Sequence, residues 1–111
     1  MSRWSHLRAS VSIQELVRLR TAGVVLRNRS IHNASEWMLF HKEFEEWERA
    51  VIREMERAGV RASDISHFQT LDLFTPLVFA HAFDDLHAKD LRELSEKIRR
   101  LTEITPRYDR G

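Results

Sequence analysis

An arginine, an asparagine and a histidine lie within six residues of one another and could act together on a phosphodiester. The chain reads LRNRSIH from residue 26 to residue 32. Arg27 carries a planar guanidinium that can bind two oxygens of a phosphate at once. Histidine is the side chain that ordinarily exchanges a proton near neutral pH, so His32 could move a proton at a ribose hydroxyl or a leaving oxygen, with Asn28 as a polar helper. Five residues turn a helix by about 140°, so Arg27 and His32 converge only if the helix ends near Ser30.

The R-N-x-x-x-H spacing resembles the active-site motif of the HEPN superfamily of helical ribonucleases. That resemblance implies a small helical bundle, two copies of which form a composite cleft that cuts RNA without a metal ion. It would make Arg27 the phosphate ligand, His32 the general acid or base, and Asn28 their polar neighbour. A HEPN-like endoribonuclease is therefore one candidate function.

Other segments resemble a group of uncharacterised bacterial helical proteins. They read LRN at 26–28, WE at 47–48, FQTLD at 68–72 and LSEKIRRL at 94–101. In that group no activity can be named, the LRN is associated with helix packing, and no histidine is expected at the position of His32. This second resemblance favours a role in helix packing, and not in catalysis, for the same residues.

The composition excludes several classes of protein. With 111 residues the chain is long enough for one domain, and 42% hydrophobic with 32% charged residues is typical of a globular protein. The absence of Cys excludes disulfides, thiolate zinc sites and a catalytic thiol. No apolar run approaches the roughly 20 residues of a membrane span, and no secretory signal is recognisable, so we expect a cytoplasmic protein. The pairs His81/Asp85 and Asp84/His87 lack further ligands, so no metal or cofactor is expected.

Basic residues are concentrated at the N-terminal end. Residues 1–30 hold six Arg against the single acidic residue Glu15. Such a segment can bind nucleic acid without catalysis, or it can pack beside an acidic second helix. Arg20 and Arg27 fall on the apolar face of the first predicted helix, where we expect internal Glu or Asp partners because unpaired buried charges are costly.

Two long helices are predicted in the first half of the chain. A capping box of Ser12 and Glu15 starts the first helix, which runs to about Ser30, and Gly23 on its apolar face would let another helix approach closely. Asn33 with Glu36, or else Ser35, caps a second helix of about 22 residues that ends at Gly59. The apolar face of the first helix holds Ile13, Leu16, Val17, Leu19, Val24 and Leu26, and the core stripe of the second holds Trp37, Phe40, Phe44, Trp47, Val51, Met55 and Ala58.

The second half predicts a short helix and a long one. Ser63 would cap a helix over residues 64–70, with Ile65 and Phe68 facing the core. Residues 76–83 can be read as helix or loop, and we favour a break at Asp84. The last helix then carries a heptad-like seam of His87, Leu91, Leu94, Ile98 and Leu101.

These patterns predict an all-α fold, a small antiparallel helical bundle of three main helices plus a short one. Residues 1–11 would be a flexible basic arm, residues 12–104 a single helical domain, and residues 105–111 a tail. The favoured function is a non-catalytic module that binds itself, as a symmetric dimer, or another protein. The seam of the last helix, or the second helix, would form the interface. RNA is the partner under the alternatives.

Overall fold

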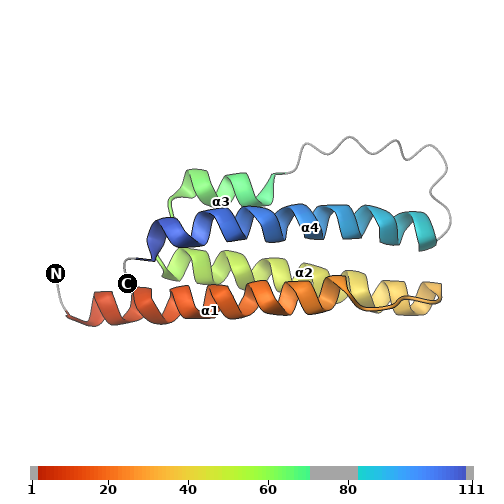
Figure 1. Ribbon diagram of the computed structural model, residues 1–111, viewed down its shortest axis with the longest axis horizontal. Coiled ribbons are helices and arrows are strands. Elements are labelled where there is room, and N and C mark those ends of the chain that lie inside the picture. Colours follow the sequence, from red (N-terminus) through yellow and green to blue (C-terminus); the bar gives the residue numbers. More distant parts are fainter. Residues whose placement is uncertain (1–2, 71–82, 110–111) are drawn as a thin grey trace.

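The computed structural model describes residues 3–70 and 83–109, with side chains described for residues 12–70 and 84–109. These residues form four helices and no strand: α1 (Arg3–Arg27), α2 (Ala34–Arg57), α3 (Ala62–Gln69) and α4 (Phe83–Tyr108). The predicted all-α bundle of three main helices and a short one is confirmed (Figure 1). Of the stretch 76–83, which the sequence left open between helix and loop, only Phe83 lies within the described residues.

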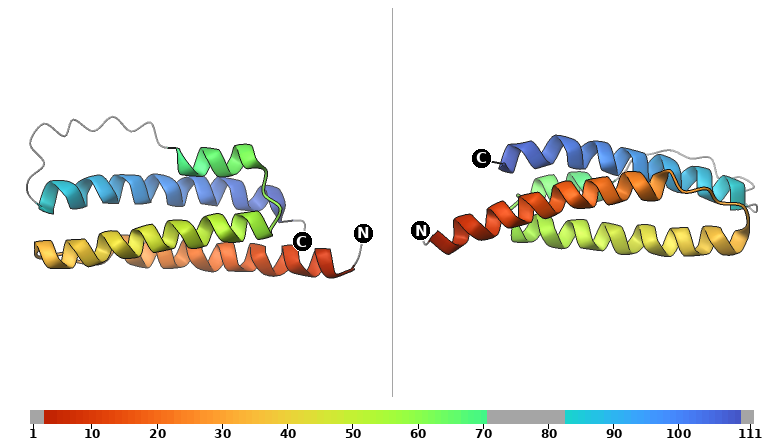
Figure 2. Two further views of the ribbon diagram at one scale, coloured as in Figure 1. Left: turned by 180° about the vertical axis from the view of Figure 1, so that it is seen from behind. Right: turned by 60° about the horizontal axis from the view of Figure 1, so that its bottom comes forward.

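The helices lie along one another in an elongated bundle. α1 runs antiparallel to α2 and α4, whereas α2 and α4 run parallel, because the chain crosses back through α3 and the following segment before α4 begins (Figure 2). The parallel direction is visible in the contacts, since Trp37 of α2 meets Asp90 of α4, and Glu48, about three turns further along α2, meets Lys97, about two turns further along α4. None of the described helices is long and apolar enough to cross a membrane.

The start of α1 differs from the prediction. The helix begins at Arg3, and Ser12 is a buried residue in its interior rather than an N-cap. Residues 3–11 contain neither Gly nor Pro, so nothing in them stops the helix from extending toward the N-terminus. The predicted arm is therefore helical from Arg3 onward, and the helix ends at Arg27, three residues before Ser30.

Both ends of α2 follow the predicted capping chemistry. Asn33 is the N-cap, and its side chain accepts a hydrogen bond from the Glu36 N–H at 2.9 Å, so the alternative cap Ser35 is not used. At the other end Gly59 has φ +77°. The Gly59 N–H donates to the Glu56 carbonyl and the Val60 N–H to the Met55 carbonyl, a Schellman motif that stops the helix.

Gly23 lets a side chain of α2 pack directly against the backbone of α1. The indole of Trp47 lies directly over it, so that a Cβ at position 23 would be 2.8 Å from Trp47 Cζ2. The same indole donates its N–H to the Leu19 carbonyl at 2.7 Å. The bulky side chain of one helix thus occupies the space left by the missing side chain of the other.

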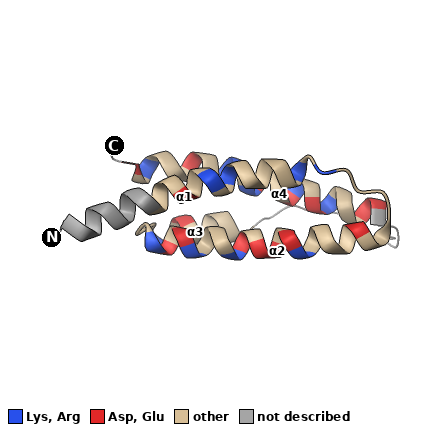
Figure 3. Ribbon diagram, turned by 90° about the horizontal axis from the view of Figure 1, so that it is seen from below, with Lys and Arg blue, Asp and Glu red and all other residues tan. Residues whose placement is uncertain are grey.

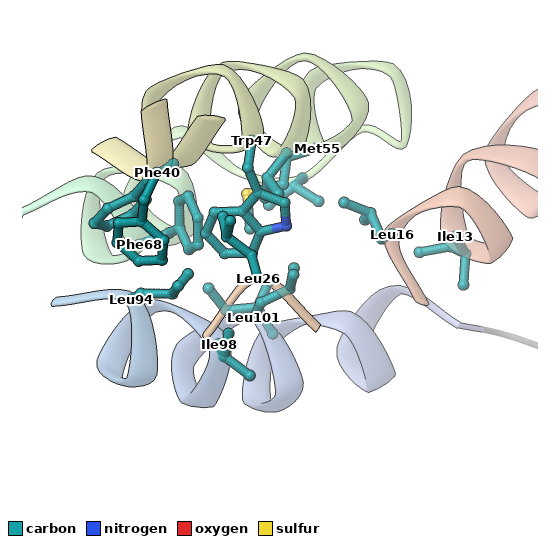
Figure 4. Close-up of a cluster of buried hydrophobic side chains, with 14 residues drawn as sticks. Ile13, Leu16, Leu26, Phe40, Trp47, Met55, Phe68, Leu94, Ile98 and Leu101 are labelled. Atoms are coloured by element: carbon teal, nitrogen blue, oxygen red, sulfur yellow. The ribbon is translucent and has the colours of Figure 1, made fainter. Parts of the chain in front are cut away.

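The core is formed by all four helices (Figure 4). The central residues of the predicted α2 stripe are buried, and Trp37 and Ala58 at its ends are partly buried. On α1, Leu19 and Val24 are also only partly buried, and Val17 is exposed although the pattern placed it on the apolar face. The buried hydrophobic residues are Ile13, Leu16, Leu26, Phe40, Phe44, Trp47, Val51, Met55, Val60, Phe68, Leu94, Ile98, Leu101 and Ile104.

α3 is anchored mainly by α4. Phe68 is fully buried as predicted and Ile65 partly, but the helix starts at Ala62 after the N-cap Arg61, so Ser63 is not its cap. The Phe68 ring lies against the Trp47 ring and 5.6 Å from the ammonium of Lys97, which pairs with Glu48 at 2.8 Å.

The C-terminal end of α4 also holds α3. The Tyr108 hydroxyl donates to the Asp64 carboxylate and accepts the Arg61 N–H, while Arg107 pairs with Asp64 at 3.1 Å. The helix therefore continues to Tyr108, past Pro106, where the sequence predicted a tail from residue 105.

Candidate functional site

The predicted interaction seam of α4 lies inside the bundle. Leu94, Ile98 and Leu101 are buried core residues, and Leu91 is partly buried against the same core. His87 packs edge-on against the Phe40 ring, with 5.0 Å between ring centroids. These side chains are used within one chain, so the seam is not an exposed interface of the folded protein. The core stripe of α2 is buried as predicted, so in the second helix, the other predicted interface, only side chains outside that stripe are left for a partner.

The predicted ribonuclease residues lie at and just after the end of α1. Arg27 is the last residue of the helix, half-buried, and its guanidinium has no hydrogen bond or ion pair within the described part of the chain. Asn28 is exposed and its N–H donates to the Val24 carbonyl. His32 is exposed in the connection to α2. The helix does end between Arg27 and His32, as their convergence would require.

A carboxylate holds His32. The backbone N–H of His32 donates to the Glu36 carboxylate at 2.8 Å, and the ring Nδ1 of His32 lies 3.3 Å from the same carboxylate oxygen. Glu36 is also the residue whose N–H is capped by Asn33, so His32 is part of the N-terminal structure of α2. A carboxylate beside an imidazole can orient it for proton transfer, but here the contact is also explained by the cap.

The basic residues of α1 are partly neutralised by acidic neighbours. Arg18 pairs with Glu15 at 2.8 Å, and Arg29, just after the helix, pairs with Glu43 of α2. Arg20 is exposed and, like Arg27, has no ion pair among the described residues, so the internal partners that the sequence predicted for both are not present there. Basic and acidic residues are interspersed along α2 and α4, whereas in the described part of α1 Glu15 is the single acidic residue (Figure 3).

Sequence reasoning missed a polar network between α2 and α4. Asp90 is only 4% exposed, and its Oδ2 accepts the indole N–H of Trp37 at 3.0 Å and lies 2.9 Å from Nδ1 of His41. The other ring nitrogen of His41 lies 2.8 Å from Glu45. At 100° per residue Asp90 falls beside the apolar seam of α4, a pattern that signals a buried carboxylate but does not identify partners 49 and 53 residues away.

This network can orient an imidazole, and it fastens α2 to α4. A carboxylate on one ring nitrogen fixes the ring and leaves the other nitrogen for proton transfer, but in His41 that nitrogen already faces Glu45. Within residues 12–70 and 84–109, no group of three or more His, Asp or Glu side chains is arranged to hold a metal ion. The network therefore acts here as a buried polar contact between two helices.

A second charged cluster lies on α4. The hydrogen bond from Arg99 lowers the pKa of Glu96 to about 2; partial burial works in the opposite direction, and a hydrogen bond from Arg100 lowers the pKa further. Arg100 also donates to the carbonyls of His67 and Thr70 at the end of α3. The cluster thus links the surface of α4 to the end of α3.

Apolar side chains remain exposed on the α1–α2 half of the molecule. Among the described residues the large hydrophobic side chains left in solvent are Val17 (47%) and Val25 (66%) on α1, and Met38 (64%) and Leu39 (56%) on α2. Val17, Thr21 and Val25 follow one another at intervals of four residues, so they share one stripe of α1. α3 and α4 expose no such residue in their described parts.

Comparison with known proteins identifies no relative of this chain. No protein-family model, no curated protein and no solved structure matches it.

Proposed function

We propose that this chain is a non-catalytic helical module that assembles with itself through the α1–α2 half of the bundle. The observation that supports the proposal is the segregation of exposed hydrophobic side chains, all of which, among the described residues, lie on α1 and α2. Single exposed hydrophobic residues are common on protein surfaces, but several on one half of a small protein are typical of an interaction site.

The rest of the structure agrees with a binding role. The core is complete without these residues, since nine of its side chains are almost fully buried. Keeping valine, methionine and leucine in water therefore contributes nothing to the stability of the isolated chain, whereas covering them in a complex would be favourable. The cytoplasm remains the expected location of such an assembly.

A HEPN-like ribonuclease is the second candidate, supported by one observation. Arg27 lacks an intramolecular partner in the described structure, so its guanidinium could bind a phosphate. His32 lies five residues away, but it contacts Glu36. Nucleic-acid binding without catalysis is a further alternative, supported by Arg27 and Arg20, neither of which has an ion pair within the described part of the chain.

Light scattering at increasing protein concentration tests the assembly proposal. We expect the weight-average mass to rise with concentration for the wild type and for Ser66→Lys, a matched control on the exposed face of α3. Val25→Lys should keep the bundle folded, because Val25 is mostly in solvent, and its mass should rise only at concentrations at least about tenfold higher. Equal association of Val25→Lys and Ser66→Lys would show that the exposed apolar side chains of α1 take no part in assembly.

A further inference from the structure

The exposed surface of α1 has a symmetric pattern. Four residues of α1 and Asn28, which directly follows the helix and still donates its N–H to the Val24 carbonyl, are spaced by three, four, four and three. They form one stripe, which we call the outer stripe: Gln14, Val17, Thr21, Val25 and Asn28. Read in either direction from Thr21, the stripe shows a valine and then a side-chain amide. All five residues are exposed, and none is charged, in a chain of which 32% is charged.

We propose that the outer stripe binds the same stripe of a second copy of this chain, with the two α1 helices antiparallel and the two-fold axis at Thr21. This inference rests on the proposed self-assembly and specifies its geometry. In a two-fold contact residue i of one copy meets residue j of the other, and j meets i. The antiparallel arrangement places Val17 beside the partner's Val25 and Gln14 beside the partner's Asn28, at both ends of the contact.

The residue at the axis suits this position. A charged side chain on a two-fold axis would meet its own copy, so an uncharged residue is required there. The Thr21 hydroxyl already donates to the Val17 carbonyl of its own helix at 3.3 Å. It can therefore be removed from water without leaving a donor unpaired, while its methyl group contacts the partner.

The ends of the stripe supply directional contacts. The side-chain amides of Gln14 and Asn28 have no hydrogen bond within the described part of the chain, and each carries both donors and an acceptor. Across an antiparallel pair these amides would bond one another and fix the register, as buried amides do in coiled coils. Arg18, next to the stripe, is held by Glu15 of its own helix, which limits repulsion between the two copies.

The expected strength is modest. A contact through one helix of each copy is smaller than the roughly 800 Å² per partner of a standard interface. We therefore expect a dimer that dissociates in the micromolar range, and because each substitution acts twice in a symmetric dimer, Val25→Lys should raise Kd by at least about tenfold.

Cysteine cross-linking tests the geometry sharply, because the natural chain contains no Cys. Helices packed about 8–10 Å apart bring facing Cα atoms into the roughly 4–7 Å range that a disulfide requires. Thr21→Cys should therefore oxidise to a covalent dimer within the native bundle. Ser66→Cys, also exposed but on α3 and outside the proposed assembly surface, is the matched control and should stay monomeric under the same mild oxidation.

A mixing experiment separates antiparallel from parallel pairing. In the antiparallel dimer Gln14 lies about 21 Å along the helix from its own copy but level with the partner's Asn28. Gln14→Cys and Asn28→Cys should therefore cross-link when mixed and not when oxidised separately. A covalent homodimer of Gln14→Cys alone would overturn the antiparallel geometry.

The failure of this inference is distinguishable from the failure of self-assembly. If the wild type dimerises but Thr21→Cys cross-links no faster than Ser66→Cys, the interface lies elsewhere and the geometry is refuted while assembly stands. A wild type that remains monomeric at all concentrations would refute both.

Discussion

Replacing Gly23 by alanine should destabilise the bundle, although alanine is the better helix former. Exposed to solvent in the middle of a helix, Gly→Ala raises the free energy of unfolding by about 0.5–1 kcal/mol. At position 23 the new methyl group would lie 2.8 Å from Cζ2 and 2.9 Å from Cε2 of the Trp47 ring. Carbon atoms prefer separations of about 3.5–4.0 Å, so the ring, the methyl group or the two helices must move.

The ring has little freedom to move. Its N–H is bonded to the Leu19 carbonyl at 2.7 Å, and its faces and edges meet the rings of Phe44 and Phe68. Overpacking a core by one methyl group costs about 1–3 kcal/mol, and weakening the indole hydrogen bond costs about 1 kcal/mol more. After the gain in helix propensity is subtracted, we expect Gly23→Ala to lower the free energy of unfolding by about 1–3 kcal/mol.

Urea denaturation of four proteins measures this effect and identifies its cause. The set is the wild type, Gly23→Ala, Trp47→Leu and the double variant. In the Trp47→Leu background the methyl group meets no indole, so Gly23→Ala should become neutral or stabilising there. If Gly23→Ala raises the free energy of unfolding while Trp47 is present, the close α1–α2 contact is wrong.

Three further predictions concern single residues. His87→Leu should raise the free energy of unfolding by about 1 kcal/mol, because Nε2 of His87 is buried without a hydrogen-bond partner among the described residues; a loss in urea denaturation would contradict this. Arg99 holds the pKa of Glu96 near 2, so the resulting stabilisation is complete above pH 4.5, the ordinary pKa, and is lost as the pH falls toward 2. Glu96→Gln should make the free energy of unfolding less dependent on pH between about 4.5 and 2, and an NMR titration of Glu96 with a midpoint near 4.5 would exclude the effect. Finally, the wild type should leave single-stranded RNA intact in EDTA. Arg27→Ala should change the melting temperature, whereas His32→Ala should leave it unchanged. Cleavage of RNA by the wild type that is lost in both variants, while both variants remain folded, would establish the ribonuclease instead.

Local signals in the sequence were sufficient for α2. Its aromatic stripe repeats at helical spacing, Asn33 and Glu36 stand at capping distance, and Gly59 supplies the positive φ that ends the helix. Each of these effects acts within a few residues, so each can be read from one stretch of sequence. The start of α1 was missed because a capping box inside a longer helix has the same letters as one at its beginning.

Long-range packing could not be read in this way. The seam from His87 to Leu101 is apolar at heptad spacing whether another chain or the rest of the same chain covers it, and in the structure the same chain does. The contacts of Asp90 with Trp37 and His41 join residues 53 and 49 positions apart, and they depend on α2 and α4 running parallel. No local pattern specifies that direction.

For the candidate ribonuclease residues too, position along the chain could be predicted from the sequence but contacts could not. The ends of helices can be predicted, so the placement of Arg27 at the end of α1 and of His32 in a connection follows from the sequence to within a few residues. The free guanidinium of Arg27 does not follow, because a side chain on the apolar face of a helix is expected to find a partner that only the folded bundle could supply. The outer stripe appears only once the structure shows which face of α1 is covered.

Sedimentation equilibrium of the wild type, from about 1 µM to about 1 mM, tests the self-assembly of this chain most directly. The proposed dimer predicts a reversible rise in average mass from one chain toward two, with Val25→Lys shifting the rise to concentrations at least about tenfold higher. The mass of a single chain throughout that range, identical for the wild type and Val25→Lys, would contradict it.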